Sequence, residues 1–467
     1  MLLFLAIHRN KDDKVNKAKI VATFGPALDK PSVLKKAVKY IDIVRINFSH
    51  GNPEQWVEFK EKAERAANIL GKELAFLADL PGPKIRLGKL DPEVYVRKGD
   101  TVKFGYMPKK TNETIPVNYP NLARDSRKGA QIIIGDGILR FKITDIKAGK
   151  IECIAENSGM LLSNKGISLK GASINTQVPT KEDLEKGRLA IKNGFDMLAL
   201  SFVKNPESIT YARRQFGSIP LVSKIERKEA VERIDEISKV SDAIMVARGD
   251  LALDVDIEEV PVMQRLVVAS AMKYCKPVIV ATQMLASMVE NPMPTRAEVN
   301  DIASSVMQGA DCMMLSDETA AGKYPIEALS TMFNTIANAE KFAQPRAREY
   351  QIVSSNDKIA HAAVDIANTY SVDAIFTPTK SGATARRISA LRPRSRIIAM
   401  SSDSKVRRSL LPYFGVEPTE IAKYENVDRM LGLVHEKAKK MKARKYLVVF
   451  GRPNKTGSTD TLRFIEE

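Results

Sequence analysis

Cysteine is scarce in this chain. Its 467 residues include three cysteines, Cys153, Cys275 and Cys312, which lie far apart in the sequence. An odd number of well-separated cysteines argues against a disulfide framework and against a thiolate metal cluster. Because disulfides are rare where thiols are kept reduced, we expect the protein to work in the cytoplasm.

Long apolar runs are also missing. No segment approaches the roughly 20 consecutive apolar residues that a membrane-spanning helix needs, so we expect no membrane association. The opening segment Met1–Ile7 is apolar, but it lacks a preceding basic region and a small-residue cleavage site. We therefore interpret residues 1–15 as a packing arm or a start-site artefact rather than a signal peptide.

Tryptophan is represented by Trp56 alone, whereas positive charge is abundant. The 73 lysines and arginines exceed the 56 acidic residues, which gives a net charge of +17. One interpretation of such charge is nucleic-acid binding. Acidic residues are interspersed throughout, however, and a single tryptophan offers little surface for base stacking. We favour attraction of small polyanions such as nucleotides and phosphorylated acids, with no nucleic-acid partner.

Short apolar strands alternate with helical patterns over much of the chain. The eight predicted strands are Lys19–Phe24, Ile41–Phe48, Glu73–Leu80, Met197–Phe202, Leu221–Ile225, Ala243–Val246, Val278–Ala281 and Cys312–Leu315. Eight strands with intervening helices predict an α/β protein with a (β/α)8 TIM barrel. A doubly wound open sheet is the alternative, but no Gly-rich dinucleotide turn follows the first strand.

The alternation is interrupted once and restarts near the end. Residues 86–179 contain short alternating segments separated by glycine turns, which predict an inserted small β-barrel domain. The barrel would then comprise residues 16–85 and 180–345. Residues 346–467 suit a separate C-terminal α/β domain. Its predicted elements are a helix at Ile359–Asn368 and strands at Ala374–Thr377, Ile397–Met400 and Tyr446–Phe450.

Polar residues alternate with apolar ones where the second strand ends. Arg45 offers a planar set of donors that suits a phosphate or carboxylate. Asn47 and Ser49 share one face of the strand, while Ile46 and Phe48 take the other. The polar face is suited to a cation or to phosphate oxygens. A strand end with solvated polar residues is the alternative.

Two carboxylates lie at the predicted ends of neighbouring strands, where the chain reads Lys224-Ile225-Glu226 and Arg248-Gly249-Asp250. Glu226 and Asp250 would reach one rim of the barrel, where they could share a Mg²⁺ ion. Lys224 lies two residues before Glu226 and shares its face, as suits stabilisation of a transferring phosphoryl group. Gly249 offers a backbone N–H beside Asp250. A purely structural pair between Lys224 and Glu226 is the alternative.

Together these segments resemble the pyruvate kinase family over nearly the whole chain. The matching stretches are Thr23–Ala27, Arg45–Gly51, Asp79–Gly88, Asn164–Gly166, Ser223–Glu226, Met245–Leu251, Ala281–Leu285, Pro294–Glu298 and Met314–Thr319. The resemblance implies a barrel A domain, an inserted B domain that acts as a lid, and a C-terminal domain. It also implies the conversion of phosphoenolpyruvate and ADP to pyruvate and ATP, the final step of glycolysis.

The resemblance also implies residue roles. Glu226 and Asp250 would bind Mg²⁺, for which Mn²⁺ could substitute. The implied catalytic residues are Arg45, Lys224 and Thr282, whose hydroxyl suits water orientation or proton relay. The implied substrate-binding positions are Arg45, Ser201, Lys224, Gly249, Asp250 and Thr282. Among them, the backbone N–H groups near Gly249 and Asp250 and the Thr282 hydroxyl would hold the substrate carboxylate. The implied nucleotide-binding positions are Asn47, Phe48, Ser49, His50, Arg86 and Lys165.

One departure from the family concerns K⁺. Many members bind K⁺ through positions that match Asn47, Ser49, Asp79 and the carbonyl of Leu80. Those members usually carry Thr-Lys after the aspartate and Glu after Gly-Pro. This chain has Leu-Pro at residues 80–81 and then Lys84. The ammonium of Lys84 would supply the positive charge, so the chain resembles the K⁺-independent members.

The C-terminal region contains a second candidate site. Hydroxyls, a glycine and a predicted helix start between Thr379 and Arg386 would form an anion cradle. The matching family loop is often an effector site for sugar phosphates or nucleotides. That resemblance implies a phosphorylated allosteric effector at Thr379, Ser381, Gly382 and Thr384. A plain helix cap is the alternative.

The resemblance further implies a homotetramer joined through the A and C domains. Two other functions stay open at this point. One is a different barrel enzyme acting on phosphoenolpyruvate or pyruvate, such as a mutase or lyase. These enzymes lack the inserted domain and a nucleotide site. The other is a non-catalytic nucleic-acid-binding protein, which the net charge alone supports.

Overall fold

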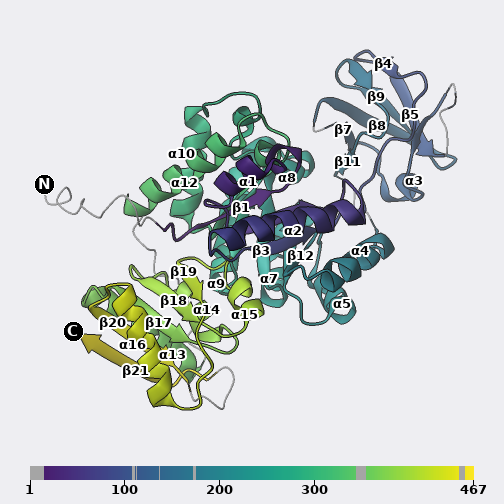
Figure 1. The fold of residues 1–467 in the computed structure, drawn as a ribbon. Coiled ribbons are helices and arrows are strands. Elements are labelled where there is room, and N and C mark those ends of the chain that lie inside the picture. Colours follow the sequence, from purple (N-terminus) through teal and green to yellow (C-terminus); the bar gives the residue numbers. More distant parts are fainter. Residues whose placement is uncertain are drawn as a thin grey trace, which may run out of the picture. The chain divides into compact units, whose positions relative to one another are not determined.

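The computed structural model describes residues 15–107, 111, 113–135, 137–171, 175–342, 354–451 and 458–466 (Figure 1). Residues 1–14 of the predicted N-terminal arm lie outside the described residues. So does the predicted boundary at residues 345–346. Among the helices of the described part, none combines the length and the apolar character that crossing a bilayer requires.

The chain divides into two compact units. Unit 1 comprises Met1–Val44, Lys62–Ala75 and Met284–Glu467, and unit 2 comprises Arg45–Glu61 and Phe76–Gln283. Since this division runs through the strands of the barrel rather than around it, the domain boundaries stated above stay predictions.

Eight parallel strands form a closed barrel in the order β1-β16-β15-β14-β13-β12-β3-β2. The strands are β1 (Lys19–Thr23), β2 (Ile43–Asn47), β3 (Ala75–Asp79), β12 (Met197–Leu200), β13 (Leu221–Ile225), β14 (Ala243–Ala247), β15 (Val278–Ala281) and β16 (Cys312–Leu315). The predicted barrel is therefore confirmed, and the alternative of an open sheet is wrong.

The amino-acid composition of these strands explains why they are buried on both faces of the sheet. Every residue of β1, β3, β13 and β14 is buried. A parallel strand that is covered on both faces needs such a continuous apolar run instead of an alternating one. The polar residues that interrupt the pattern, such as Ser223 and Lys224 in β13, are consequently buried as well.

Helices connect the barrel strands. They are α1 (Pro31–Ala37), α2 (Pro53–Ile69), α4 (Lys181–Lys192), α5 (Pro206–Phe216), α6 (Lys228–Glu232), α7 (Ile234–Val240), α8 (Arg248–Asp254), α9 (Val260–Lys273), α10 (Arg296–Gln308), α11 (Asp317–Ala320) and α12 (Pro325–Phe342). Short 3₁₀ turns are η1 (Pro26–Leu28), η2 (Ile257–Glu259) and η3 (Ala286–Val289). Capping boxes at Thr180 and Thr295 satisfy backbone donors at the starts of α4 and α10.

The segment after β3 forms two sheets whose strand pairs are antiparallel, except that β5 and β6 run parallel. A six-stranded sheet has the order β11-β7-β8-β9-β5-β6, and a two-stranded sheet joins β10 and β4. The elements are β4 (Val94–Val96), β5 (Thr101–Tyr106), β6 (Ile115–Val117), α3 (Leu122–Asp125), β7 (Gln131–Ile134), β8 (Leu139–Lys147), β9 (Lys150–Ala155), β10 (Gly159–Leu161) and β11 (Ile167–Lys170). Isolated bridges join Arg86 to Gly166 and Leu87 to Val117, which connects the two ends of the larger sheet.

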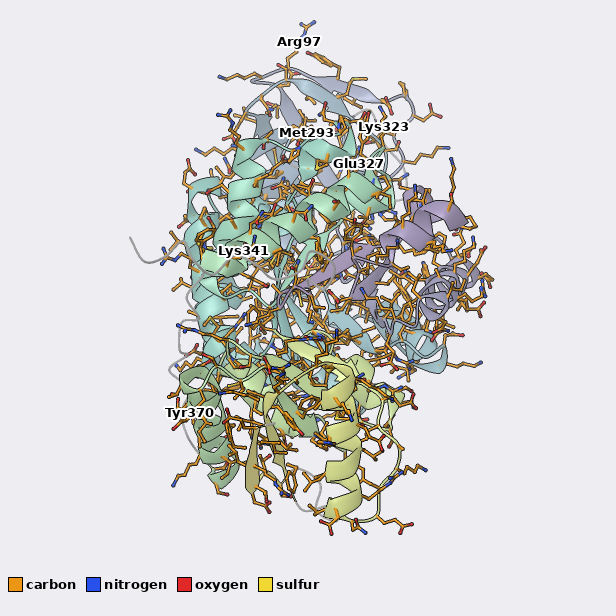
Figure 2. All side chains as sticks on the ribbon, turned by 60° about the vertical axis from the view of Figure 1, so that its left-hand side comes forward. Arg97, Met293, Lys323, Glu327, Lys341 and Tyr370 are labelled. Atoms are coloured by element: carbon orange, nitrogen blue, oxygen red, sulfur yellow. The ribbon has the colours of Figure 1, made fainter. Side chains whose placement is uncertain are left out.

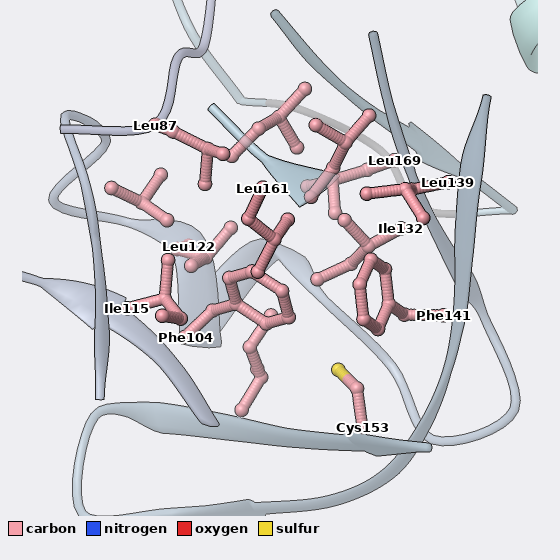
Figure 3. Close-up of a cluster of buried hydrophobic side chains, with 14 of the residues drawn as sticks. Leu87, Phe104, Ile115, Leu122, Ile132, Leu139, Phe141, Cys153, Leu161 and Leu169 are labelled. Atoms are coloured by element: carbon pink, nitrogen blue, oxygen red, sulfur yellow. The ribbon is translucent and has the colours of Figure 1, made fainter. Parts of the chain in front are cut away.

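This insert has its own apolar core. Figure 3 shows side chains from several strands meeting in it, including Leu87, Phe104, Phe141 and Leu161. The rings of Phe104 and Phe141 meet edge to face, with centroids 5.2 Å apart. A separate core means that the insert does not depend on the barrel for its packing.

The C-terminal region contains a five-stranded sheet in the order β19-β18-β17-β20-β21. Its elements are α13 (Ser355–Thr369), β17 (Ala374–Pro378), α14 (Ala383–Ala390), β18 (Arg396–Met400), α15 (Ser404–Ser409), β19 (Val416–Thr419), α16 (Val427–Lys440), β20 (Lys445–Phe450) and β21 (Thr461–Glu466). One face packs on α13 and α14, and the other packs on α16. The predicted α/β class is confirmed.

The two edge strands of this sheet were missed from sequence. In β19 only Val416 is buried, and the strand includes Pro418. In β21 no residue is buried. Edge strands need neither continuous apolar character nor a complete set of donors, so the pattern that identified the central strands is weak there.

Charged side chains of both signs cover the surface. Arg97, Lys323, Glu327 and Lys341 are all exposed (Figure 2). Ion pairs accompany many of them, as between Arg396 and Glu417, whose side chains are 41% and 21% exposed. Such pairs typically contribute about 0–1 kcal/mol because water screens them.

A buried ion pair in unit 1 generates a first prediction. The Arg392 guanidinium lies 2.9 Å from the Asp311 carboxylate, with side-chain exposures of 5% and 3%. It also lies 3.9 Å from the ring centre of Phe414. Replacing Arg392 with methionine would leave Asp311 buried beside an apolar group, at a cost of about 3–5 kcal/mol. We expect Arg392→Met to lower the midpoint of thermal unfolding clearly.

Arg396→Met is the matched control, because it removes an arginine from a partly exposed pair in the same unit. Its expected cost is at most about 1 kcal/mol. Equal losses of thermal stability in the two variants, measured at one scan rate, would contradict the assignment of Arg392 and Asp311 as a stabilising buried pair.

Candidate active site

The residues predicted for catalysis, substrate, nucleotide and metal all belong to unit 2. Arg45 lies in β2, Asp79 ends β3, Lys224 lies in β13, and Thr282 follows β15. The carboxyl ends of parallel barrel strands meet at one rim, where TIM-barrel active sites form. One placement differs from the prediction, because Asp250 does not end a strand but lies in the first turn of α8.

Lys224 is the centre of a buried ionic network. Its Nζ lies 2.8 Å from Glu226 Oε1 and 3.2 Å from Asp79 Oδ1. It also donates to Ser201 Oγ at 2.8 Å. Burial opposes the charge, but Asp79, Glu226 and Asp250 outweigh it and raise the lysine pKa above its usual range. Lys224 is therefore an ammonium at any physiological pH.

Asp79 connects Lys224 to Arg45. The Nε atom of Arg45 lies 2.7 Å from Asp79 Oδ2, and the aspartate side chain is 2% exposed. Burial alone would raise the pKa of this carboxyl, but the charges and hydrogen bonds of Lys224 and Arg45 lower it. The carboxylate thus stays ionised and binds one cation through each of its two oxygens.

Glu226 is held equally firmly. Its Oε2 accepts a 2.6 Å hydrogen bond from the backbone N–H of Phe202, whose φ is 58°. Burial raises the pKa of this carboxyl to about 7 against the opposing charge of Lys224, and the nearby Asp250 adds to the increase. A second positive charge beside Glu226 and Asp250 would favour the ionised form.

The carboxylates of Glu226 and Asp250 fit a hard divalent cation, which prefers oxygen ligands. The described residues contain no group of three or more His, Cys, Asp or Glu side chains able to hold a metal. Two carboxylates are the protein contribution that Mg²⁺ usually has in nucleotide enzymes, where substrate oxygens and water complete the shell.

The positions expected for K⁺ are occupied by internal bonds. The Leu80 carbonyl accepts from Ser201 Oγ at 2.7 Å. Asn47 Oδ1 accepts from the backbone N–H of Ser49 at 3.0 Å. Lys84 is exposed and lies beside Gly166, because a Cβ added to that glycine would be 3.4 Å from Lys84 Cε.

Thr282 and Gly249 contact each other. The backbone N–H of Gly249 donates to Thr282 Oγ1 at 2.7 Å. Thr282 has a φ of 70°, an unusual conformation for a β-branched residue. The two groups predicted to hold a substrate carboxylate therefore satisfy one another here, and a bound carboxylate would compete for the same N–H.

The predicted nucleotide-binding residues divide into buried and accessible ones. The ring of Phe48 stacks on Trp56 at a centroid distance of 4.0 Å and is buried, so it is closed to a ligand. Its backbone N–H donates to the Asp79 carbonyl at 2.9 Å, and its carbonyl accepts from Lys186 at 2.9 Å. His50 is exposed. In the insert, Arg86 Nη1 donates to the Asn164 carbonyl at 3.1 Å, and Lys165 is exposed.

The candidate effector loop is largely satisfied by its own contacts. The backbone N–H of Gly382 donates to Thr379 Oγ1 at 2.8 Å. The Thr384 hydroxyl is buried and lies 2.7 Å from that of Thr459. Gly382 has a φ of 79°, and a Cβ there would be 2.8 Å from Leu410. This geometry is equally that of a helix cap, so the alternative stays open.

Sequence reasoning missed two functional candidates. Asp79 was predicted only as a K⁺ position, although it joins both cations of the site. Arg248 belongs to a matching stretch but received no role, and it lies 8% exposed beside Thr282. The available signal was an arginine directly after an apolar strand, where buried charge calls for a specific partner.

Comparison with known proteins identifies the family of this chain. A family model described as "Pyruvate kinase, barrel domain" matches residues 15–329, and one described as "Pyruvate kinase, alpha/beta domain" matches residues 357–465. The chain is 34% identical over 468 residues to "Pyruvate kinase" of Thermococcus litoralis, covering 97% of this chain and 98% of the relative. It is 35% identical over 469 residues to "Pyruvate kinase" of Thermotoga maritima, covering 97% and 100%. The chain belongs to the pyruvate kinase family.

Proposed function

We propose that unit 2 transfers the phosphoryl group of phosphoenolpyruvate to ADP, giving pyruvate and ATP in the final step of glycolysis. The observation that carries the proposal is the buried Lys224 ammonium held between Asp79 and Glu226, with Arg45 on the far side of Asp79. Family membership supports this enzyme over a mutase or lyase and over a nucleic-acid-binding protein.

Phosphoryl transfer needs positive charge and alignment more than covalent help from the protein. Arg45 and Lys224 would bind the oxygens of the moving phosphoryl group and lower the energy of the charge that develops on them. Lys224 would also stabilise the enolate left behind. Thr282, or water beside it, would assist protonation of the methylene carbon that completes pyruvate.

The family generally uses Mg²⁺, and we propose that Glu226 and Asp250 hold it here, with Mn²⁺ as a substitute. When bound, the ion would supply Lewis-acid stabilisation of substrate oxygens. The buried Glu226 carboxylate, whose pKa burial raises to about 7, suits this role because a cation would favour its ionised form.

The remaining substrate contacts are proposed by position. Ser201, Gly249, Asp250 and Thr282 would bind phosphoenolpyruvate. Closure of the insert over the barrel rim would exclude water from the reaction. The nucleotide would lie against Asn47, Phe48, Ser49, His50, Arg86 and Lys165, with the buried ring of Phe48 making no direct contact.

We also propose a homotetramer. Val262 and Leu266 lie one turn apart on α9 and are 60% and 53% exposed, which suits a face that another copy covers.

A phosphorylated effector at Thr379, Ser381, Gly382 and Thr384 is the matching proposal for the C-terminal loop. Sedimentation equilibrium with and without sugar phosphates or nucleotides tests both. The cytoplasmic location stays a prediction.

Lys224→Met is the sharpest test of the proposed reaction. Methionine keeps the length of the side chain but removes the ammonium that phosphoryl transfer needs, so turnover should fall by several orders of magnitude. Metal affinity should change far less, because Glu226 and Asp250 remain. The measurement is a coupled assay for pyruvate, combined with Mn²⁺ titration of the free protein.

Lys72→Met is the control for loss of a half-buried lysine. Lys72 lies before β3, and its ammonium donates to the Lys39 carbonyl at 3.2 Å. We expect this variant to retain turnover. Turnover retained in Lys224→Met would mean that Lys224 is only structural, and absence of ADP-dependent pyruvate formation in the unmodified protein would contradict the proposed function itself.

Independence from K⁺ is a third prediction. Asp79 already holds the charges of Arg45 and Lys224, and the Leu80 carbonyl already accepts from Ser201. We therefore expect full activity with Mg²⁺ in buffer free of Na⁺ and K⁺. Negligible activity that added K⁺ restores would contradict this prediction.

Replacement of Lys84 tests the source of that independence. Lys84→Glu restores the carboxylate that K⁺-dependent members carry after Gly-Pro, so we expect its activity to rise on addition of K⁺. Lys84→Met removes charge without adding a carboxylate and is the matched control. Equal responses of the two variants to K⁺ would show that residue 84 does not set the cation requirement.

A further inference from the structure

We propose that Arg248 is a positioning residue that holds the strained Thr282 backbone, and through it the spacing between the Thr282 hydroxyl and α8. The proposal rests on the proposed function for its kinetic consequences, but its structural content is independent of them. It assigns a role to a buried arginine that touches no reacting atom in the mechanism above.

The strain lies in two consecutive residues after β15. Thr282 has a φ of 70° and Gln283 a φ of 56°, so both adopt the left-handed conformation without being glycine. A β-branched residue such as Thr282 is especially disfavoured there. Such a conformation is strained and persists only where surrounding contacts enforce it. The contacts that enforce it must therefore reach this peptide directly.

Arg248 supplies such contacts. Its Nε and Nη2 atoms donate to the Thr282 carbonyl at 3.2 and 2.7 Å. Its Nη1 lies 3.5 Å from Oε1 of Gln264 on α9, and both side chains are buried. Two parallel donors on one carbonyl fix the orientation of the peptide plane, which a single donor does not.

A second contact acts on the side chain of the same residue. The backbone N–H of Gly249 donates to Thr282 Oγ1 at 2.7 Å. The two residues face one another, because a Cβ added to Gly249 would lie in van der Waals contact, 3.4 Å from that hydroxyl oxygen. Thr282 is thus held by its carbonyl and by its hydroxyl, and both partners belong to the first turn of α8.

The position of α8 matters because Asp250 follows Gly249 in it. Arg248 and the proposed metal ligand Asp250 lie in the same turn of α8. The bonds from Arg248 to the Thr282 carbonyl therefore also determine how Thr282 is placed relative to Asp250. Without the guanidinium, Thr282 would relax toward negative φ. Its hydroxyl would then move away from the backbone N–H of Gly249. Misplacement of a binding group by about 1 Å can cost about a hundredfold in rate.

The alternative is that Arg248 only stabilises the fold by joining α8 to α9. Arg248→Lys separates the two roles, since it keeps the charge but cannot donate in parallel to one carbonyl. We expect about a hundredfold lower kcat in this variant. In a Thr282→Ala background the same change should add little further loss, because Arg248 acts through Thr282.

Gln283→Gly is the rescue variant. Gln283 is exposed, and glycine adopts positive φ without penalty, so it lowers the strain that Arg248 must oppose. We expect it to restore part of the kcat lost in Arg248→Lys. The control is Arg407→Lys, which alters another buried arginine that donates to Glu73 at 2.9 and 2.6 Å. It should lower thermal stability without changing kcat.

Additive losses in the Arg248 and Thr282 double variant, or no rescue by Gln283→Gly, would overturn the proposal. A crystal structure of Arg248→Lys decides the matter separately from activity. We expect Thr282 to leave the left-handed region and its bond to Gly249 to be lost. If the unmodified protein formed no pyruvate, the proposed function would fail, while a retained φ near 70° in the variant would still refute the positioning role.

Discussion

The Lys224 ammonium is the charge around which the site is organised. A buried lysine without partners would lose its proton, because burial disfavours the charged form. Here the lysine Nζ lies 3.2 Å from one oxygen of Asp79 and 2.8 Å from one oxygen of Glu226. Arg45 forms an ion pair with the second oxygen of Asp79. The neighbouring charges favour the ionised forms of Lys224 and Asp79, so removal of one member would alter the protonation or the position of the others.

Three of the nine non-glycine residues with positive φ in the described part of the chain lie at the same rim. Phe202, Thr282 and Gln283 all have positive φ, and they follow the ends of β12 and β15. The strained residues hold functional groups in place: Phe202 donates to Glu226, and Thr282 accepts from Gly249. Strain of this kind is tolerated where it orients groups for a ligand. The buried Arg248 explains how it persists at Thr282.

Much of the fold was predictable from the chain. The strands β13, β15 and β16 begin and end where the apolar runs do, because strands buried on both faces leave a continuous signature. The predictions were wrong or incomplete for segments that are not strands buried on both faces. Residues 248–254 form α8, although Arg248 to Asp250 had been assigned to a strand end, and the edge strands β19 and β21 were missed.

The chemical identity of the site was determined by sequence alone, since residue types and their order after each strand limit which groups can reach the barrel rim. The tertiary structure decided the pairing. Asp79 and Lys224 are 145 positions apart in the numbering yet 3.2 Å apart in space. No local pattern encodes that distance, nor the contact of Arg248 with Thr282. Both arise because closure of the barrel brings strand ends together, and the energy of a buried charge depends on neighbours from distant segments.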